Sequence, residues 1–231
     1  MRNSLLRMKF NWRYALGEVL LIIVGVTVAL AGTAWYDERQ ERRDELVALQ
    51  QLRETLADDL ESIRYYQQEI ERIDRDIYSL IDYLQTDKPY TEELDRWFGS
   101  LGSWRSVNVR TGPFESLKSN GFELISDPAI RARLIGFYED TYPSLSRNED
   151  IDRDFVRDKV WSYFFVNFSR PNDEQGFWRP LDYAAIRDEP YVLNLCKWRV
   201  SSHERFLRRN LISSVAEIGD LLVALDGVLG Y

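Results

Sequence analysis

The feature that most constrains this chain is an apolar segment close to its N-terminus. From Tyr14 to Trp35 the sequence reads YALGEVLLIIVGVTVALAGTAW, and Glu18 is the only charged residue in it. About 20 helical residues cross a hydrocarbon core of roughly 30 Å, and aromatic residues commonly flank such a helix at the two interfaces. The segment therefore predicts a transmembrane helix over residues 14–35, surrounded by membrane lipid.

A secretory signal peptide is the alternative interpretation of the same segment. The basic residues that would form its charged region are Arg2, Arg7, Lys9 and Arg13. Ala29-Leu30-Ala31 resembles a cleavage site. Glu18, however, lies where the apolar part of a signal peptide should begin, and this favours an uncleaved anchor.

Charge indicates the side of the membrane on which the rest of the chain lies. Four basic residues and one glutamate give residues 1–35 a charge of +3. Because the net charge of the whole chain is −8, residues 36–231 carry a charge of −11. Arg39, Arg42, Arg43 and Arg53 also follow the span, so the positive-inside rule gives only a small bias. We expect residues 1–13 in the cytoplasm and residues 36–231 outside it. Such an acidic domain repels phosphate backbones, so we expect no binding to nucleic acid.

One face of the predicted span collects its small residues together with the single charge. At steps of three and four residues, this stripe comprises Glu18, Ile22, Gly25, Ala29 and Gly32. Small residues let transmembrane backbones approach closely, so the stripe predicts a homo-oligomer or a subunit of a membrane protein complex. Alternatively, Gly and Ala are simply frequent in membrane helices and Glu18 extends to the interface, or Glu18 belongs to an ion pathway.

Beyond the span, apolar residues recur at the spacing of one helical stripe. They are Leu49, Leu52, Leu56, Leu60, Ile63, Tyr66, Ile70, Ile73, Ile77, Leu80 and Leu84. Residues 36–86 contain neither Pro nor Gly, so we expect one long helix that continues from the span. It could form a coiled coil or the spine of a bundle, and the helical patterns that follow favour the bundle.

The rest of the chain also predicts helices, so the expected fold class is all-α. In order, we expect short helices and loops over residues 87–126, helices over residues 127–169 that are interrupted or bent at Tyr142-Pro143, a loop over residues 170–189 and a last helix over residues 190–228. Pro113 and Gly121 should begin and end a short helix, and Asp127 with Pro128 should begin another. Val107-Asn108-Val109 is the one alternating segment that could form a strand.

Two stretches carry a resemblance to a known family. They are RYALGEVLLIIVGVTVALAGTAWYDERQERR and TGPFESLKSNGFELISDPAIRARLIGFYE, with a weaker echo in DYAAIRDEPYVLNL. The chain resembles a family of uncharacterised bacterial single-span membrane proteins, in which an Ala-Ile-Gly-Glu-Ile-Leu type span runs into a Trp-Asn-Glu-Xaa-Arg collar. Here Trp35-Tyr36-Asp37-Glu38 stands in the place of that collar. The resemblance implies a membrane location and a bacterial source, and it transfers no catalytic residues. Together with the orientation expected from charge, it predicts a bacterial inner (plasma) membrane protein with a periplasmic domain.

Residue types that carry catalysis or bind cofactors are sparse. Cys196 is the only cysteine and His203 the only histidine, which excludes an intrachain disulfide and most transition-metal or Ser/His schemes. Val200 stands where a Glu-Xaa-Xaa-His metal motif would need a glutamate. We therefore expect no enzyme, no catalytic residue and no cofactor. His203 and Glu204 should make a polar contact at the bundle surface or between helices.

A run of acidic residues could suggest a calcium site. It comprises Glu149, Asp150, Asp152 and Asp154. The run lacks the glycine turn and the distant bidentate glutamate of a calcium loop. We therefore expect no metal there and predict the solvated start of a helix.

Aromatic and basic residues alternate in the loop-rich middle of the chain. This group comprises Arg96, Trp97, Phe98, Trp104, Arg105, Arg110, Phe114 and Lys118. Aromatic residues and Arg dominate binding hot spots, so the group predicts a patch for a ligand or partner. The alternative is a lid of short helices that seals one end of the bundle. A second cluster, Phe177-Trp178-Arg179-Pro180, could pack against the patch or contact a partner.

These features favour a membrane-anchored structural or interaction subunit that oligomerises or joins a larger complex. The alternative is an extracytoplasmic ligand-binding or sensing module, which would act through a partner because few residues precede the span. A homo-oligomeric channel depends only on Glu18 and its stripe, and an enzyme comes last.

Overall fold

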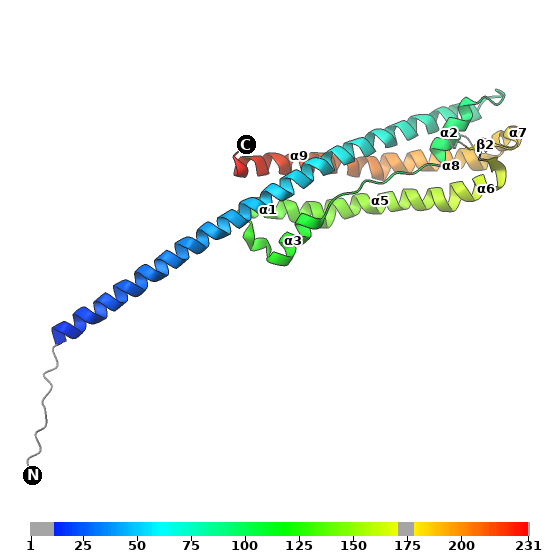
Figure 1. Ribbon diagram of the computed structural model, residues 1–231. Coiled ribbons are helices and arrows are strands. Elements are labelled where there is room, and N and C mark those ends of the chain that lie inside the picture. The colour runs from blue at the N-terminus through cyan, green and yellow to red at the C-terminus, as the bar shows by residue number, and fades with distance from the viewer. Residues whose placement is uncertain (1–11, 171–177, 231) are drawn as a thin grey trace, which may run out of the picture. The chain divides into compact units, whose positions relative to one another are not determined.

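The computed structural model describes residues 12–170 and 178–230 (Figure 1). The chain divides into two units, Met1–Val47 and Ala48–Tyr231. One helix, α1 (Trp12–Leu84), contains the predicted span and continues into the helical bundle of the second unit. The division at Val47 lies beyond the predicted boundary at residue 35, because residues 36–44 are exposed along their whole length.

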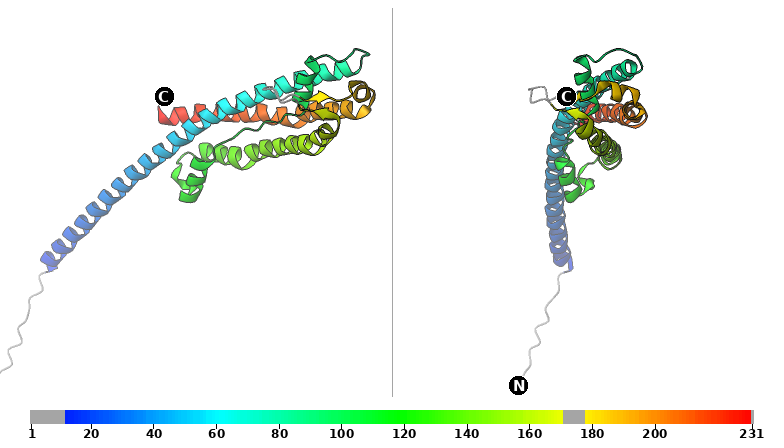
Figure 2. Two further views of the ribbon diagram at one scale, coloured as in Figure 1. Left: turned by 45° about the vertical axis from the view of Figure 1, so that its right-hand side comes forward. Right: turned by 90° about the vertical axis from the view of Figure 1, so that its right-hand side faces the viewer.

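The remaining elements belong to the second unit and are mostly helical, which confirms the all-α prediction (Figure 2). In order they are α2 (Glu93–Leu101), α3 (Gly112–Asn120), η1 (Phe122–Leu124), α4 (Pro128–Gly136), η2 (Phe137–Thr141), α5 (Tyr142–Phe155), η3 (Val156–Trp161), α6 (Ser162–Asn167), β1 (Phe168–Ser169), β2 (Arg179–Pro180), α7 (Tyr183–Asp188), α8 (Pro190–Ser202), η4 (His203–Leu207) and α9 (Arg208–Leu229).

Three long rods lie side by side in the second unit (Figures 1 and 2). The first is the bundle part of α1, the second runs from α4 to α6, and the third runs from α8 to α9. Every apolar position predicted along the stripe from Leu49 to Leu84 is buried, so this stripe is the α1 side of the core. The prediction of a long bundle helix is confirmed, with its end at Leu84.

Three π-helical segments, η2, η3 and η4, occur within the second and third rods. The chain is not interrupted at Tyr142-Pro143, since it stays helical from α4 through α6. Pro143 is the second residue of α5 and follows directly on the π-helical segment η2. The predicted last helix is also continuous and includes η4.

Local signals place the ends of two helices as predicted. Pro113 lies in the first turn of α3, and Gly121 follows its end with φ of 99°, a conformation that favours glycine. The carboxylate of Asp127 accepts hydrogen bonds from the N–H groups of Ala129 and Ile130 at the start of α4.

The predicted loop over residues 170–189 is wrong in two places. Phe168 and Ser169 pair antiparallel with Pro180 and Arg179, which makes a two-stranded ribbon. Helix α7 follows Asp182, whose carboxylate accepts the N–H of Ala185 as an N-cap. The possible strand Val107-Asn108-Val109 is not a strand, because the N–H of Val107 donates to the carboxylate of Glu149 instead of to another strand.

Candidate functional site

The predicted association stripe lies on the exposed surface of α1. Glu18, Ile22, Gly25, Ala29 and Gly32 are all exposed. A Cβ added at Gly25 or Gly32 would meet no atom within 4 Å. Among the described residues, α1 is the one helix long and apolar enough to cross a membrane, and the qualifying part lies near the N-terminus. The predicted basic residues Arg2, Arg7 and Lys9 lie outside the described residues.

The predicted aromatic and basic patch is divided by the fold. Trp97, Phe98 and Phe114 are buried in the core, where Phe114 stacks on Tyr138. The exposed Lys118 forms an ion pair with Glu139 at 2.7 Å. Arg110 pairs with Asp58 on α1. Of the predicted group, only Arg96, Trp104 and Arg105 line a common pocket. The buried members therefore act as core residues, as the alternative of a lid of short helices implied.

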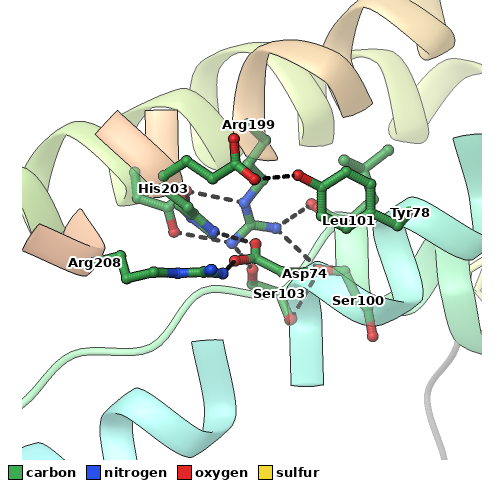
Figure 3. A network of polar contacts seen from close by, with 10 residues as sticks. Asp74, Tyr78, Ser100, Leu101, Ser103, Arg199, His203 and Arg208 are labelled. Atoms are coloured by element: carbon green, nitrogen blue, oxygen red, sulfur yellow. Dashed lines mark hydrogen bonds and ion pairs between the residues drawn. The ribbon is translucent and has the colours of Figure 1, made fainter. Parts of the chain in front are cut away.

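The centre of the bundle holds a buried chain of charged residues, here called the charge chain (Figure 3). It comprises Arg208, Asp74, His203, Asp152 and Arg199, so that charges of opposite sign alternate along it. Asp74 comes from α1, Asp152 from α5, and the other three from the third rod. The charge chain therefore connects all three rods.

Arg199 is completely buried, and each of its five N–H donors has an acceptor. Nε and Nη2 bind the two oxygens of the Asp152 carboxylate, both at 2.9 Å. The other three bonds go to the carbonyl oxygens of Ser100, Leu101 and Ser103, at 2.6–2.9 Å. These carbonyls belong to the C-terminal end of α2, where a cation is favoured. A full set of bonds is what makes a buried guanidinium tolerable.

His203 lies between two carboxylates. Its Nδ1 is 2.6 Å from Asp74 Oδ1, and its Nε2 is 3.0 Å from Asp152 Oδ1. Burial by itself lowers the pKa of His203, but the hydrogen bonds to Asp152 and Asp74 outweigh it and the pKa is raised. Carboxylates accept hydrogen bonds and do not donate them, so both ring nitrogens carry a proton. His203 is therefore an imidazolium in this arrangement.

The Arg208 end of the charge chain reaches the bundle surface, whereas the Arg199 end is buried. Asp74 Oδ2 accepts a hydrogen bond from Arg208 at 3.0 Å, and 40% of the Arg208 side chain is exposed. Next to this pair, the hydroxyl of Tyr78 donates to Glu204 at 2.5 Å. Asp152 loses solvation by burial, yet Arg199 and His203 hold its pKa below the usual range. Asp152 is therefore ionised in the fold.

Comparison with protein-family models, with curated proteins and with solved structures found no significant match to this chain. The resemblance to the single-span bacterial family therefore stays a prediction.

Ser100 connects the charge chain to a second set of polar contacts. Its hydroxyl donates to Asp76 at 2.6 Å, while its carbonyl oxygen accepts from Arg199. Asp76 is 5% exposed and also forms ion pairs with Arg72 and Arg96. The end of α2 is therefore held from both sides, by α1 and by α8.

This end of α2 forms one wall of a pocket of about 450 Å³. Its arginine and tryptophan side chains are those of Arg72, Arg96, Arg105, Arg170, Trp104, Trp161 and Trp178, and it is called the arginine–tryptophan pocket below. The indole N–H of Trp161 donates to the carbonyl oxygen of Gly102 at 2.7 Å. A Cβ added at Gly102 would come within 3.0–3.2 Å of Phe164 and Trp178, so these rings would have to shift by a few tenths of an ångström to admit one.

The second predicted cluster is only partly described, because Phe177 lies outside the described residues. Trp178 lines the pocket, and Arg179 forms an ion pair with Asp95 at 2.8 Å. Within residues 12–170 and 178–230, no group of three or more His, Cys, Asp or Glu side chains could hold a metal ion. Burial raises the pKa of Cys196 to about 12, so its thiol is unreactive.

Sequence reasoning missed most of the charge chain. The acidic run was expected to be solvated, but Glu149 and Asp152 are buried, and they lie in the middle of α5. His203 does make an interhelical contact, although it is buried and separate from the contact of Glu204. A signal was present in the spacing. Glu149 and Asp152 continue the helical stripe of Leu145 and Val156, and all four are buried.

Proposed function

We propose that this protein is a membrane-anchored interaction subunit of a bacterial inner membrane, with residues 1–13 in the cytoplasm and the bundle in the periplasm. The observation that carries this proposal is the exposure of the apolar part of α1. From Leu16 to Leu30 its large apolar side chains are 50–76% exposed, on every side of the helix.

An apolar helix without a protein cover needs another apolar environment. A helix that is hydrophobic on all sides is typical of a buried core or of a membrane span. No side chain from Leu16 to Trp35 is buried, which leaves lipid as the environment that fits this segment. Trp35 lies at the end of the apolar run with Arg39 stacked on its ring, an arrangement that suits the interface.

The stripe of Glu18, Ile22, Gly25, Ala29 and Gly32 supports association inside the bilayer. Lipid tails are as apolar as leucine, so helices associate there through close packing and polar contacts. The open space at Gly25 and Gly32 allows a second helix to approach the backbone. The partner would be another copy of this helix or a span of a different subunit.

The test is a double substitution, Gly25→Leu with Gly32→Leu, measured by crosslinking in native membranes and by oligomer size in mild detergent. We expect the assembly to dissociate, because two leucines separate the backbones. The matched control is Leu20→Ala with Ile23→Ala on the opposite face of the helix, which should leave the assembly intact. An assembly of unchanged size in the double leucine variant contradicts the proposal.

A further inference from the structure

We propose that the arginine–tryptophan pocket binds a small planar aromatic carboxylate. This inference goes beyond the anchoring role, because the pocket lies wholly within residues 48–231 and needs no second transmembrane helix. It rests on three features of the pocket: its charge, its aromatic walls and its rigidity.

The charge of the pocket favours an anion. Three guanidinium groups, those of Arg72, Arg96 and Arg105, face it with 39–47% of their side chains exposed. These three groups form ion pairs with three carboxylates, those of Glu69, Asp76 and Glu93. Arg170 also lines the pocket, and no Asp or Glu is among its described lining residues, so the lining is cationic in a domain that is otherwise strongly acidic. The planar fork of a guanidinium matches the two oxygens of a carboxylate.

The aromatic walls favour a planar ring attached to that anion. Trp161 is fixed by its hydrogen bond to Gly102, and Trp178 is packed against Phe164 with ring centroids 5.2 Å apart. Trp104 is partly exposed and follows directly on Ser103. Indole rings favour the faces and edges of other aromatic rings. A volume of about 450 Å³ is within the usual range for small-molecule sites and accommodates a fused two-ring ligand.

The wall formed by the end of α2 is preorganised. Arg199 and Asp76 hold Ser100 from opposite sides, and Arg199 also binds the carbonyl oxygens of Leu101 and Ser103. Binding then loses little conformational entropy, which raises affinity for a ligand that fits. The charge chain is therefore a support for the pocket, without contact to the ligand.

The experiment uses the full-length protein in phosphatidylcholine nanodiscs and isothermal titration calorimetry. The probes are 2-naphthoate and its neutral counterpart 2-naphthamide, with empty nanodiscs subtracted and inorganic phosphate as a competitor. We expect naphthoate to bind at least about tenfold more tightly than naphthamide, since the charge-assisted bonds are lost in the amide. Phosphate should not displace it at equal concentration.

Two matched pairs of variants locate the binding. Arg105→Gln should weaken naphthoate binding by about tenfold or more, whereas Arg110→Gln, an exposed arginine outside the pocket, should not change it. Trp104→Leu should weaken it, whereas Trp198→Leu, which stacks on Phe155 elsewhere, should not. Absence of naphthoate binding, equal binding of the amide, displacement by phosphate, or equal effects of the two arginine variants would each overturn the proposal.

Discussion

The apolar part of α1 and the centre of the bundle differ in which side chains they expose. From Leu16 to Leu30 the large apolar side chains are 50–76% exposed, whereas Arg199, His203 and Asp152 are 0–3% exposed. Burial in the bundle thus depends on whether a side chain finds partners, and charge alone does not prevent it. The apolar side chains of the first unit need no hydrogen-bonding partner, because their composition alone makes an apolar environment favourable. One helix, α1, contains both situations.

The largest effect should come from breaking the charge chain. Arg199→Met removes the guanidinium and leaves Asp152 with His203 alone, and it leaves the carbonyl oxygens at the end of α2 without their donor. Breaking a buried ion pair costs about 3–5 kcal/mol, so we expect the free energy of unfolding to fall by that amount. Urea titration in detergent, followed by tryptophan fluorescence, measures it.

The control for this variant is Arg209→Met, which removes an exposed arginine from α9 and should change stability by less than about 0.5 kcal/mol. Arg199→Lys should not restore stability, because an ammonium cannot reproduce five planar donors. Equal midpoints for wild type and Arg199→Met would show that the charge chain does not stabilise the bundle.

A smaller effect, with a defined pH dependence, should come from Glu149. Burial raises the pKa of Glu149 from 4.5 to about 7, although the Val107 N–H partly offsets this. A carboxyl group whose pKa is raised by folding stabilises the fold at pH values below its pKa in the unfolded chain. This contribution is lost as the pH rises through its pKa in the fold, about 7. Glu149→Gln should therefore be more stable than wild type at pH 8 by on the order of 2 kcal/mol, and nearly equal at pH 4.

The measurement is the free energy of unfolding of wild type and of Glu149→Gln, obtained from urea titrations at a series of pH values. The charged and titratable groups that act on Glu149 or respond to it are Asp150, Arg153, Tyr66 and Tyr142. The unfolding free energy of Glu149→Gln still depends on pH, because the pKa values of Asp59 and His203 are also raised in the fold. Asp150→Asn, at an exposed position, should reduce the slope of unfolding free energy against pH only slightly, because Asp150 raises the pKa of Glu149 less than burial does. Parallel curves for wild type and Glu149→Gln would exclude a buried, neutral Glu149.

The smallest effect should come from the apolar part of α1. Leu21 is 76% exposed, so Leu21→Ala should change the unfolding free energy of the bundle by less than about 0.5 kcal/mol. Ile77, on the same helix, is completely buried, and Ile77→Ala should cost about 2–5 kcal/mol. Comparable losses for both variants in the same urea titration would mean that residues near Leu21 have a packing role in the bundle.

Spacing along the chain predicted much of the fold. The stripe from Leu49 to Leu84, the caps at Gly121 and Asp127, and the continuous helix are all local patterns, and the structure confirms them. The pocket was partly predicted, through Arg96, Trp104 and Arg105, but Arg72, Trp161 and Trp178 come from other elements. Their convergence depends on how three rods pack, and no local pattern contains that information.

The sequence by itself determined that this protein has an apolar helix long enough to cross a membrane, because the environment of a single helix follows from its own composition. Only the tertiary structure decided which charged residues are buried. Asp152 and Arg199 lie 47 positions apart, and Asp74 and His203 lie 129 apart. A buried charge is stable only opposite its partner, and packing of the three rods places these partners within hydrogen-bonding distance.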